Sequence, residues 1–359
     1  MRIKAGFTGK EMEQKQKNEG YNFYSGGFTS PEYRRFSQYK EYERAFKAQA
    51  KRHLRRLGNF IGLGILLFIV FNNLLALGAR YLFGNLLENT NFNLAYNIIG
   101  SFVYVGAAFF VVYLCIRKRE IGVRIIPLNK PRCRYPALLV PIGLAFCLGA
   151  SYFTSVVVSL LSNFGVELSQ AASVEPSGTQ QIILCFFATA VMPAFMEEFA
   201  LRGVVLQPLR QFGTFFAVLA SSVIFGFMHG NLIQAPFAII VGVVIGYIVV
   251  KTESIWLGII IHALNNSLSV FQTAFGEYKY YNLVMGAVIL GIFVCGAVCL
   301  IVLCVKDREF FEKDRGNLIT AEGKILTPGE KFMCMFVNAP MILSFIYICY
   351  VTSLYVSVG

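Results

Sequence analysis

The sequence predicts an all-α membrane protein, a polytopic helical bundle of eight or nine transmembrane helices preceded by a basic N-terminal arm. Hydrophobic residues make up 56% of the 359 positions and charged residues only 14%, whereas soluble domains carry about 25% charged residues. Apolar runs that reach the roughly 20 residues needed to cross a bilayer recur along the chain. Lysine and arginine gather in alternate connections between these runs, as expected for a chain that crosses a membrane repeatedly.

The N-terminal arm is expected to comprise residues 1–56, which contain fourteen lysines and arginines. Ser30-Pro31-Glu32 has the composition of a helix start, with an N-cap serine, a proline at the first helical position and an acid in the first turn. Apolar residues then recur at near-helical spacing among the cations. This pattern predicts an amphipathic basic helix that lies on the inner leaflet. The alternative is an extended cytoplasmic stub of the first span.

The transmembrane bundle is expected over residues 57–359. The predicted spans lie near 58–83, 94–116, 136–161, 181–203, 214–230, 235–250, 255–274, 283–305 and 333–356. The spans at 214–230 and 235–250 are shorter than the usual length, which is why the prediction is eight or nine spans.

The distribution of positive charge predicts the orientation. Residues 1–56, 117–134 and 306–331 are rich in lysine and arginine, whereas 84–93 and 162–180 contain none. Positively charged loops stay in the cytoplasm, so we expect the N-terminus there, in an integral protein of a bacterial plasma membrane. The net charge of +12 indicates contact with anionic membrane lipids. No nucleic-acid partner is expected, because no binding motif for one accompanies the charge.

Ionisable residues inside apolar stretches are the first indication of function, because each costs at least about 2 to 3 kcal/mol at membrane depth unless it is paired or hydrated. One stretch carries Glu197, Glu198 and Arg202 after Pro193. Glu198 and Arg202 are one helical turn apart and can pair. Glu197 points elsewhere and would suit a general base. The alternative is that both acids lie at the membrane edge and have a structural role.

His229 ends a second apolar stretch that contains Phe225. Gly213 is a plausible hairpin turn, and it stands 16 residues from both Glu197 and His229. In an antiparallel helical hairpin these two side chains would therefore lie at the same level. A satisfied core histidine is the alternative.

A third stretch carries His262 and Asn266, which share one helix face. Two hydrogen-bond donors directed at one point would suit the stabilisation of an oxyanion. Hydrogen bonding between membrane helices is the alternative for both side chains.

The three motifs in this order, Glu-Glu-x-x-x-Arg, Phe-x-x-x-His and His-x-x-x-Asn, resemble the CPBP family of CAAX proteases and bacteriocin-processing membrane enzymes. The resemblance covers a core at about residues 180–270 and implies an intramembrane endopeptidase. It implies a water activated by Glu197 and His229, an oxyanion held by His262 and Asn266, and structural support from Glu198 and Arg202. The expected partners are a peptide or protein substrate, lipidated or not, and membrane lipids.

No cofactor is favoured. The chain has no His-Glu-x-x-His sequence, and a water activated by a carboxylate needs no metal. A metalloprotease remains the alternative, in which Glu197, His229 and His262 would hold zinc with a water as the fourth ligand.

Two other functions stay open. One is a non-proteolytic membrane protein of the bacteriocin self-immunity or export-associated type, in which the motifs persist as structure. The other is a transporter or proton relay, since buried acids and histidines also suit that class. Transporters often contain internal repeats, and no second acid motif occurs in residues 1–150 or 283–359.

Overall fold

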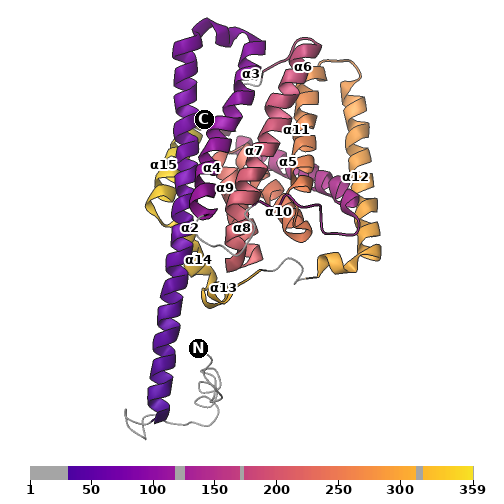
Figure 1. Cartoon of the computed structure of the whole chain (residues 1–359). Coiled ribbons are helices and arrows are strands. Elements are labelled where there is room, and N and C mark those ends of the chain that lie inside the picture. The colour runs from indigo at the N-terminus through magenta and orange to yellow at the C-terminus, as the bar shows by residue number, and fades with distance from the viewer. Residues whose placement is uncertain (1–30, 118–125, 170–173, 313–317, 359) are drawn as a thin grey trace.

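The computed structural model describes residues 31–117, 126–169, 174–312 and 318–358, and these form an all-α bundle with one very small sheet (Figure 1). The first half contains α2 (Pro31–Phe83), η1 (Gly84–Glu88), α3 (Thr90–Ser101), η2 (Phe102–Ala107), α4 (Ala108–Arg117), η3 (Pro136–Leu138), α5 (Leu139–Asn163) and β1 (Val166–Leu168). The middle contains α6 (Thr179–Cys185), η4 (Phe186–Val191), α7 (Met192–Glu198), η5 (Phe199–Val205), α8 (Leu206–Leu209), η6 (Arg210–Phe212) and α9 (Thr214–Met228). The last part contains α10 (Gln234–Thr252), α11 (Trp256–Phe275), α12 (Tyr281–Lys306), η7 (Arg308–Phe311), α13 (Ala321–Ile325), α14 (Pro328–Phe336), α15 (Ala339–Ser353) and β2 (Val356–Val358).

Helix α2 is continuous over 53 residues and begins at Pro31. The basic residues between positions 31 and 56 therefore extend the first span along its own axis, and this part of α2 protrudes beyond the rest of the bundle (Figure 1). The continuous helix has the form of the stub of the first span, with no break that would set off a separate helix. Gly58 and Gly62 let α14 and α15 approach closely, because an added Cβ would lie 2.6 Å from Met335 O and 2.7 Å from Met341 N.

The central layer of the bundle is formed by α9, α10 and α11. Helix α9 packs on α10, and α10 and α11 both pack on α5, which in turn contacts α12. On the other side α2 packs on α4, α14 and α15. The site described below lies between these two groups of helices, where the side chains are most deeply buried.

The number of membrane spans differs from the prediction. Six described helices are long and apolar enough to cross a membrane, and the bent pair α14–α15 would make a seventh. The prediction of eight or nine also counted α9 and α11. Helix α9 has only 15 residues, fewer than the roughly 20 that a span needs. Helix α11 has the length, but its polar residues His262, Asn265 and Asn266 set it apart from the apolar candidates. The span expected at 333–356 is broken by a bend of 77°.

Ion pairs gather two of the basic segments at one end of the bundle. Lys47 and Lys51 lie 2.9 and 2.8 Å from Glu330 Oε1, and His53 Nδ1 lies 2.7 Å from Glu322 Oε2. At another place β1 pairs with β2 in antiparallel fashion, which joins the loop after α5 to the end of α15. The first contacts join residues from 1–56 and 306–331, two of the segments rich in lysine and arginine.

Candidate active site

The acid pair lies on a short α-helical segment between two wider ones. Helix α7 has seven residues and Pro193 in its first turn. The flanking segments, η4 and η5, are π-helical. A proline removes one backbone donor from a helix, and π-helical turns are often found at functional sites. The π-helical segments therefore lie directly on both sides of the helix that carries Glu197 and Glu198.

Glu198 is the most deeply buried acid of the site, with no exposed side-chain surface. Its Oε1 lies 3.2 Å from Arg202 Nη1 and 3.0 Å from His262 Nδ1. The guanidinium of Arg202 lies 4.7 Å from the ring centre of Phe225. A buried charge is stable only when paired, so Glu198 and Arg202 stabilise each other, and Glu198 orients the imidazole of His262.

Glu197 lies on a different side of α7 and remains 22% exposed. Together with His229 it lines a cavity of about 50 Å³, whose other walls are Phe68, Val105, Phe225 and Met228. A cavity of roughly 10 to 15 Å³ suffices for one water if polar groups are there to bind it. The carboxylate and the imidazole are such groups, so this cavity suits a bound water.

The orientation of His229 follows from its place at the end of α9, where it is the C-cap residue. Its Nδ1 lies 2.8 Å from the carbonyl oxygen of Phe225. A carbonyl can only accept, so Nδ1 carries the hydrogen, and in a neutral ring Nε2 is left as the acceptor. The phenyl ring of Phe225 packs edge-to-face on His229 at 4.9 Å and on His262 at 5.7 Å.

The turn before α9 is the one expected. Gly213 has φ +123° and stands between η6 and α9. The resulting hairpin brings Glu197 and His229 to one cavity, as the equal spacing of 16 residues predicts. The helix also ends at the expected place, with Gly230 at φ +64° directly after His229.

His262 joins the same group from α11. Its Nε2 lies 3.7 Å from Glu197 Oε2, opposite the nitrogen that meets Glu198. Asn266 lies one turn further and is not among the residues that line the cavity. Its Nδ2 donates a hydrogen bond of 3.2 Å to the carbonyl oxygen of Thr189 in η4. His262 does not line the cavity either. The structure thus brings Glu197 and His229 to one cavity, places His262 beside Glu197, and leaves Asn266 on Thr189 O.

The sequence motifs did not identify three of the residues that line the cavity. Phe68, Val105 and Met228 are apolar residues in apolar helices, so no pattern distinguishes them from their neighbours. Tyr104 packs on Phe68 at 5.8 Å, and its hydroxyl lies 3.0 Å from Ser101 Oγ. A tyrosine inside an apolar stretch is the one signal that could have pointed to this wall.

The zinc alternative finds no support in the geometry. Among the described residues, no group of three or more histidine, cysteine, aspartate or glutamate side chains is arranged to hold a metal ion. The Nδ1 atoms of His229 and His262 are engaged by Phe225 O and Glu198, which leaves Nε2 of each ring as the nitrogen that could bind a metal. Zinc binding stays a prediction, and the chemistry below uses none.

Comparison with known proteins points to one family. A model of the Rce1-like type II CAAX prenyl endopeptidases matches residues 179–268. A Bacillus subtilis (strain 168) protein named "Putative membrane peptidase YdiL" is 28% identical over 94 residues. The match covers 26% of this chain and 38% of that relative, and no solved structure matches. The matched segment contains all three motifs and all the candidate site residues, so the resemblance to the CPBP family that the motifs indicate is confirmed.

Proposed function

We propose that the protein is an intramembrane endopeptidase that hydrolyses a peptide bond of a membrane-associated or lipidated substrate. The observation that carries this proposal is the cavity of about 50 Å³ bordered by both Glu197 and His229. A carboxylate and an imidazole at one water-sized space, within an apolar bundle, are the elements of a general base for hydrolysis. The family match at residues 179–268 supports the same reaction class.

In the proposed reaction, the water binds between the Glu197 carboxylate and Nε2 of His229. Glu197 accepts a proton as the water oxygen bonds to the scissile carbonyl carbon. The carbonyl oxygen becomes the oxyanion of a tetrahedral intermediate. The same proton then passes to the leaving nitrogen as the C–N bond breaks, which regenerates the carboxylate and balances the hydrolysis.

His262 is proposed as a donor to the oxyanion. An imidazole protonated on both nitrogens can donate from Nδ1 to Glu198 and still present Nε2–H near Glu197, 3.7 Å away. Fixed donors in a site of low dielectric stabilise developing charge without reorganisation. Asn266 is proposed as the second donor, which requires its amide to leave Thr189 O when substrate binds. Glu198 and Arg202 hold His262 in place.

The orientation of the protein in the membrane is proposed from the distribution of positive charge. The end of the bundle where Lys47, Lys51 and Glu330 meet would face the cytoplasm of a bacterial cell, by the excess of lysine and arginine there. We propose that the substrates reach the site from within the membrane.

The proposal is tested by profiling peptide termini. Wild-type protein and a Glu197→Gln variant are reconstituted in vesicles with membrane proteins from the cells that express it, and new termini are identified by mass spectrometry. We expect termini that only the wild type generates. Glu277→Gln, at an exposed position after α11, is the matched control and should behave as wild type. Identical termini from the wild type and Glu197→Gln would refute the proposal and favour a non-proteolytic protein.

A further inference from the structure

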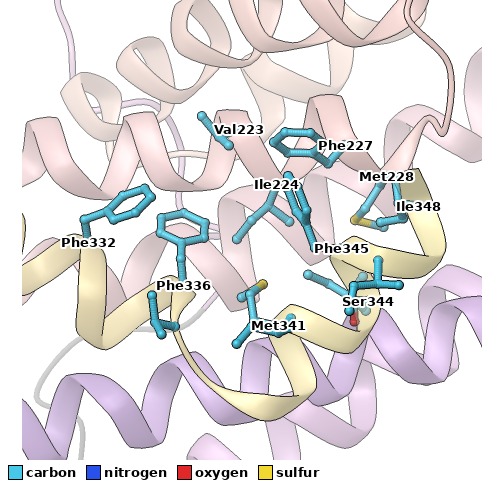
Figure 2. A pocket seen from close by; sticks show the side chains of 14 residues that line it. Val223, Ile224, Phe227, Met228, Phe332, Phe336, Met341, Ser344, Phe345 and Ile348 are labelled. Carbon is cyan, nitrogen blue, oxygen red and sulfur yellow. The ribbon is translucent and has the colours of Figure 1, made fainter. Parts of the chain in front are cut away.

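A second, hydrophobic cavity lies in a groove between α9 and the bent pair α14–α15. Its volume is about 410 Å³, within the roughly 300 to 1,000 Å³ usual for small-molecule sites. Figure 2 shows side chains from both walls around this space, with Val223, Phe227 and Met228 on α9 and Phe332, Phe336 and Phe345 on the bent pair.

The chemistry of the walls selects the ligand. Of the fourteen lining residues only Ser344 is polar, and its hydroxyl donates to Pro340 O at 2.9 Å. A ligand in the groove therefore meets hydrocarbon alone. Apolar cavities stay free of water and accept apolar molecules, so the groove suits an aliphatic chain.

The groove is built into the fold by the bend of 77° between α14 and α15. Asn338 fixes this bend, because its Nδ2 donates to Met335 O at 2.8 Å and its Oδ1 accepts from Met341 N at 3.1 Å. Phe332 and Ile346 on the rim are 55% and 60% exposed. The groove thus opens toward the hydrocarbon that surrounds the bundle, from which an acyl chain can enter.

A cation, Lys331, is the sequence neighbour of a residue that lines the groove. Lys331 directly precedes Phe332, and its Nζ lies 3.7 Å from the position of a Cβ built on Gly213, at the start of α9. No described acidic side chain forms an ion pair with Lys331. Gly213 has no side chain to cap α9, and Thr214 Oγ1 is buried without a hydrogen-bond partner among the described residues. A cation and a helix N-terminus together suit a phosphate group.

We propose that the groove binds one acyl chain of an anionic phospholipid of the bilayer, whose phosphate lies at Lys331 and the N-terminus of α9. Lys331 favours a bilayer lipid with a negative headgroup over a neutral chain. Met228 lines both this groove and the cavity of Glu197 and His229. The bound chain therefore packs against one wall of the candidate active site, although the proposal does not depend on the enzymatic activity.

Quenching of tryptophan fluorescence by brominated lipids tests this proposal. The single tryptophan of the chain, Trp256, is replaced by phenylalanine, and Phe336→Trp places a reporter in the groove. The variant is reconstituted in phosphatidylcholine vesicles that contain phosphatidylglycerol, with bromine on the acyl chains of one lipid or of the other. We expect the groove reporter to prefer the anionic lipid about fivefold, as one lysine–phosphate contact would give.

Two controls define the result. Leu290→Trp, on the exposed face of α12, should be quenched equally by both lipids. Lys331→Gln should abolish the preference at Phe336→Trp, and Lys279→Gln should leave it unchanged. Phe345→Trp, on α15, repeats the measurement in case Phe336→Trp does not fold.

Three outcomes would overturn the proposal. Equal quenching of the groove and α12 reporters by both lipids would mean contact with bulk lipid only. Protection of the groove reporters from both lipids would mean that a polypeptide segment fills the groove. A preference that survives Lys331→Gln would show that this lysine does not bind the headgroup.

Discussion

Glu198 and His262 are 64 positions apart in the sequence and meet at 3.0 Å between Oε1 and Nδ1. The contact joins α7 to α11 in the interior of the bundle. Glu198 also binds Arg202 one turn along its own helix, so one buried carboxylate fixes a cation and an imidazole at once. The adjacent residue, Glu197, meets this network only at Nε2 of His262, 3.7 Å away, and borders the cavity. The two neighbouring acids thus differ in burial and in partners, which is the physical basis for assigning them different roles.

This difference predicts that alanine substitution of Glu198 lowers the unfolding free energy much more than alanine substitution of Glu197. Glu198→Ala leaves the guanidinium of Arg202 buried without its carboxylate, which should cost about 3 to 5 kcal/mol of unfolding free energy. Glu197→Ala removes a partly exposed carboxylate and should change stability by less than about 1 kcal/mol. Thermal unfolding of both variants in the same detergent measures the contrast. Equal melting temperatures would contradict the assignment of Glu198 as the supporting residue.

His229 is predicted to matter for activity and little for stability. Among the described residues, its side chain hydrogen-bonds only to Phe225 O within its own helix end, so His229→Ala should fold normally. Loss of a group that acts on the attacking water should lower the hydrolysis rate about 100- to 10,000-fold. The rate is measured on a substrate found by terminus profiling. His53→Ala, which breaks the contact with Glu322 near the basic end, is the control and should retain activity. A His229→Ala enzyme of normal rate would exclude His229 from the reaction.

Gly258 on α11 is predicted to be required for the position of Glu198. A Cβ added there would lie 3.0 Å from Glu198 Oε2 and 2.9 Å from Ile245 Cγ2. Gly258→Ala should displace the carboxylate that orients His262, and a misplacement of about 1 Å can reduce a rate about 100-fold. Gly286→Ala on α12 is the matched control, because an added Cβ meets nothing within 4 Å. Equal rates for the two variants would show that Glu198 tolerates the shift.

A metal-free reaction is a further prediction. Purified protein should contain no stoichiometric zinc by elemental mass spectrometry, and its cleavage rate should survive 1,10-phenanthroline and EDTA. This follows from the use of Glu197 as the base and from a residue set without the arrangement of a metal site in the described part of the chain. Activity that chelation removes and zinc alone restores would contradict it.

The sequence predicted the centre of the site better than its periphery. Equal spacing about Gly213 placed Glu197 and His229 at one level because the rise of an α-helix is constant. The Glu198–Arg202 pair followed from helical periodicity in the same way. The engagement of Asn266 by Thr189 O was not predictable, because it involves a carbonyl of the π-helical segment η4, and no sequence pattern marks such a segment.

For the outer helices, the sequence predicted the positions of the apolar spans but not where the helices bend or continue. Hydropathy located the first span, but it does not determine whether the basic residues before it bend along the membrane or continue the axis, as α2 does. The span expected at 333–356 is broken because Asn338 caps a new helix near its start. Local hydrogen bonding there outweighs the apolar pattern on which the prediction rested, and the same bend creates the groove.

The most direct test of the account is the source of the oxygen in the product. Wild-type protein in vesicles is incubated with its membrane substrates in water enriched in oxygen-18, and the new C-terminal carboxylates are analysed by mass spectrometry. We expect one oxygen-18 atom in each new carboxylate from the wild type, and no new termini from Glu197→Gln or His229→Ala. New termini from either variant at the wild-type rate, or none from the wild type with any membrane fraction, would contradict the claim that these two side chains activate a water for peptide hydrolysis.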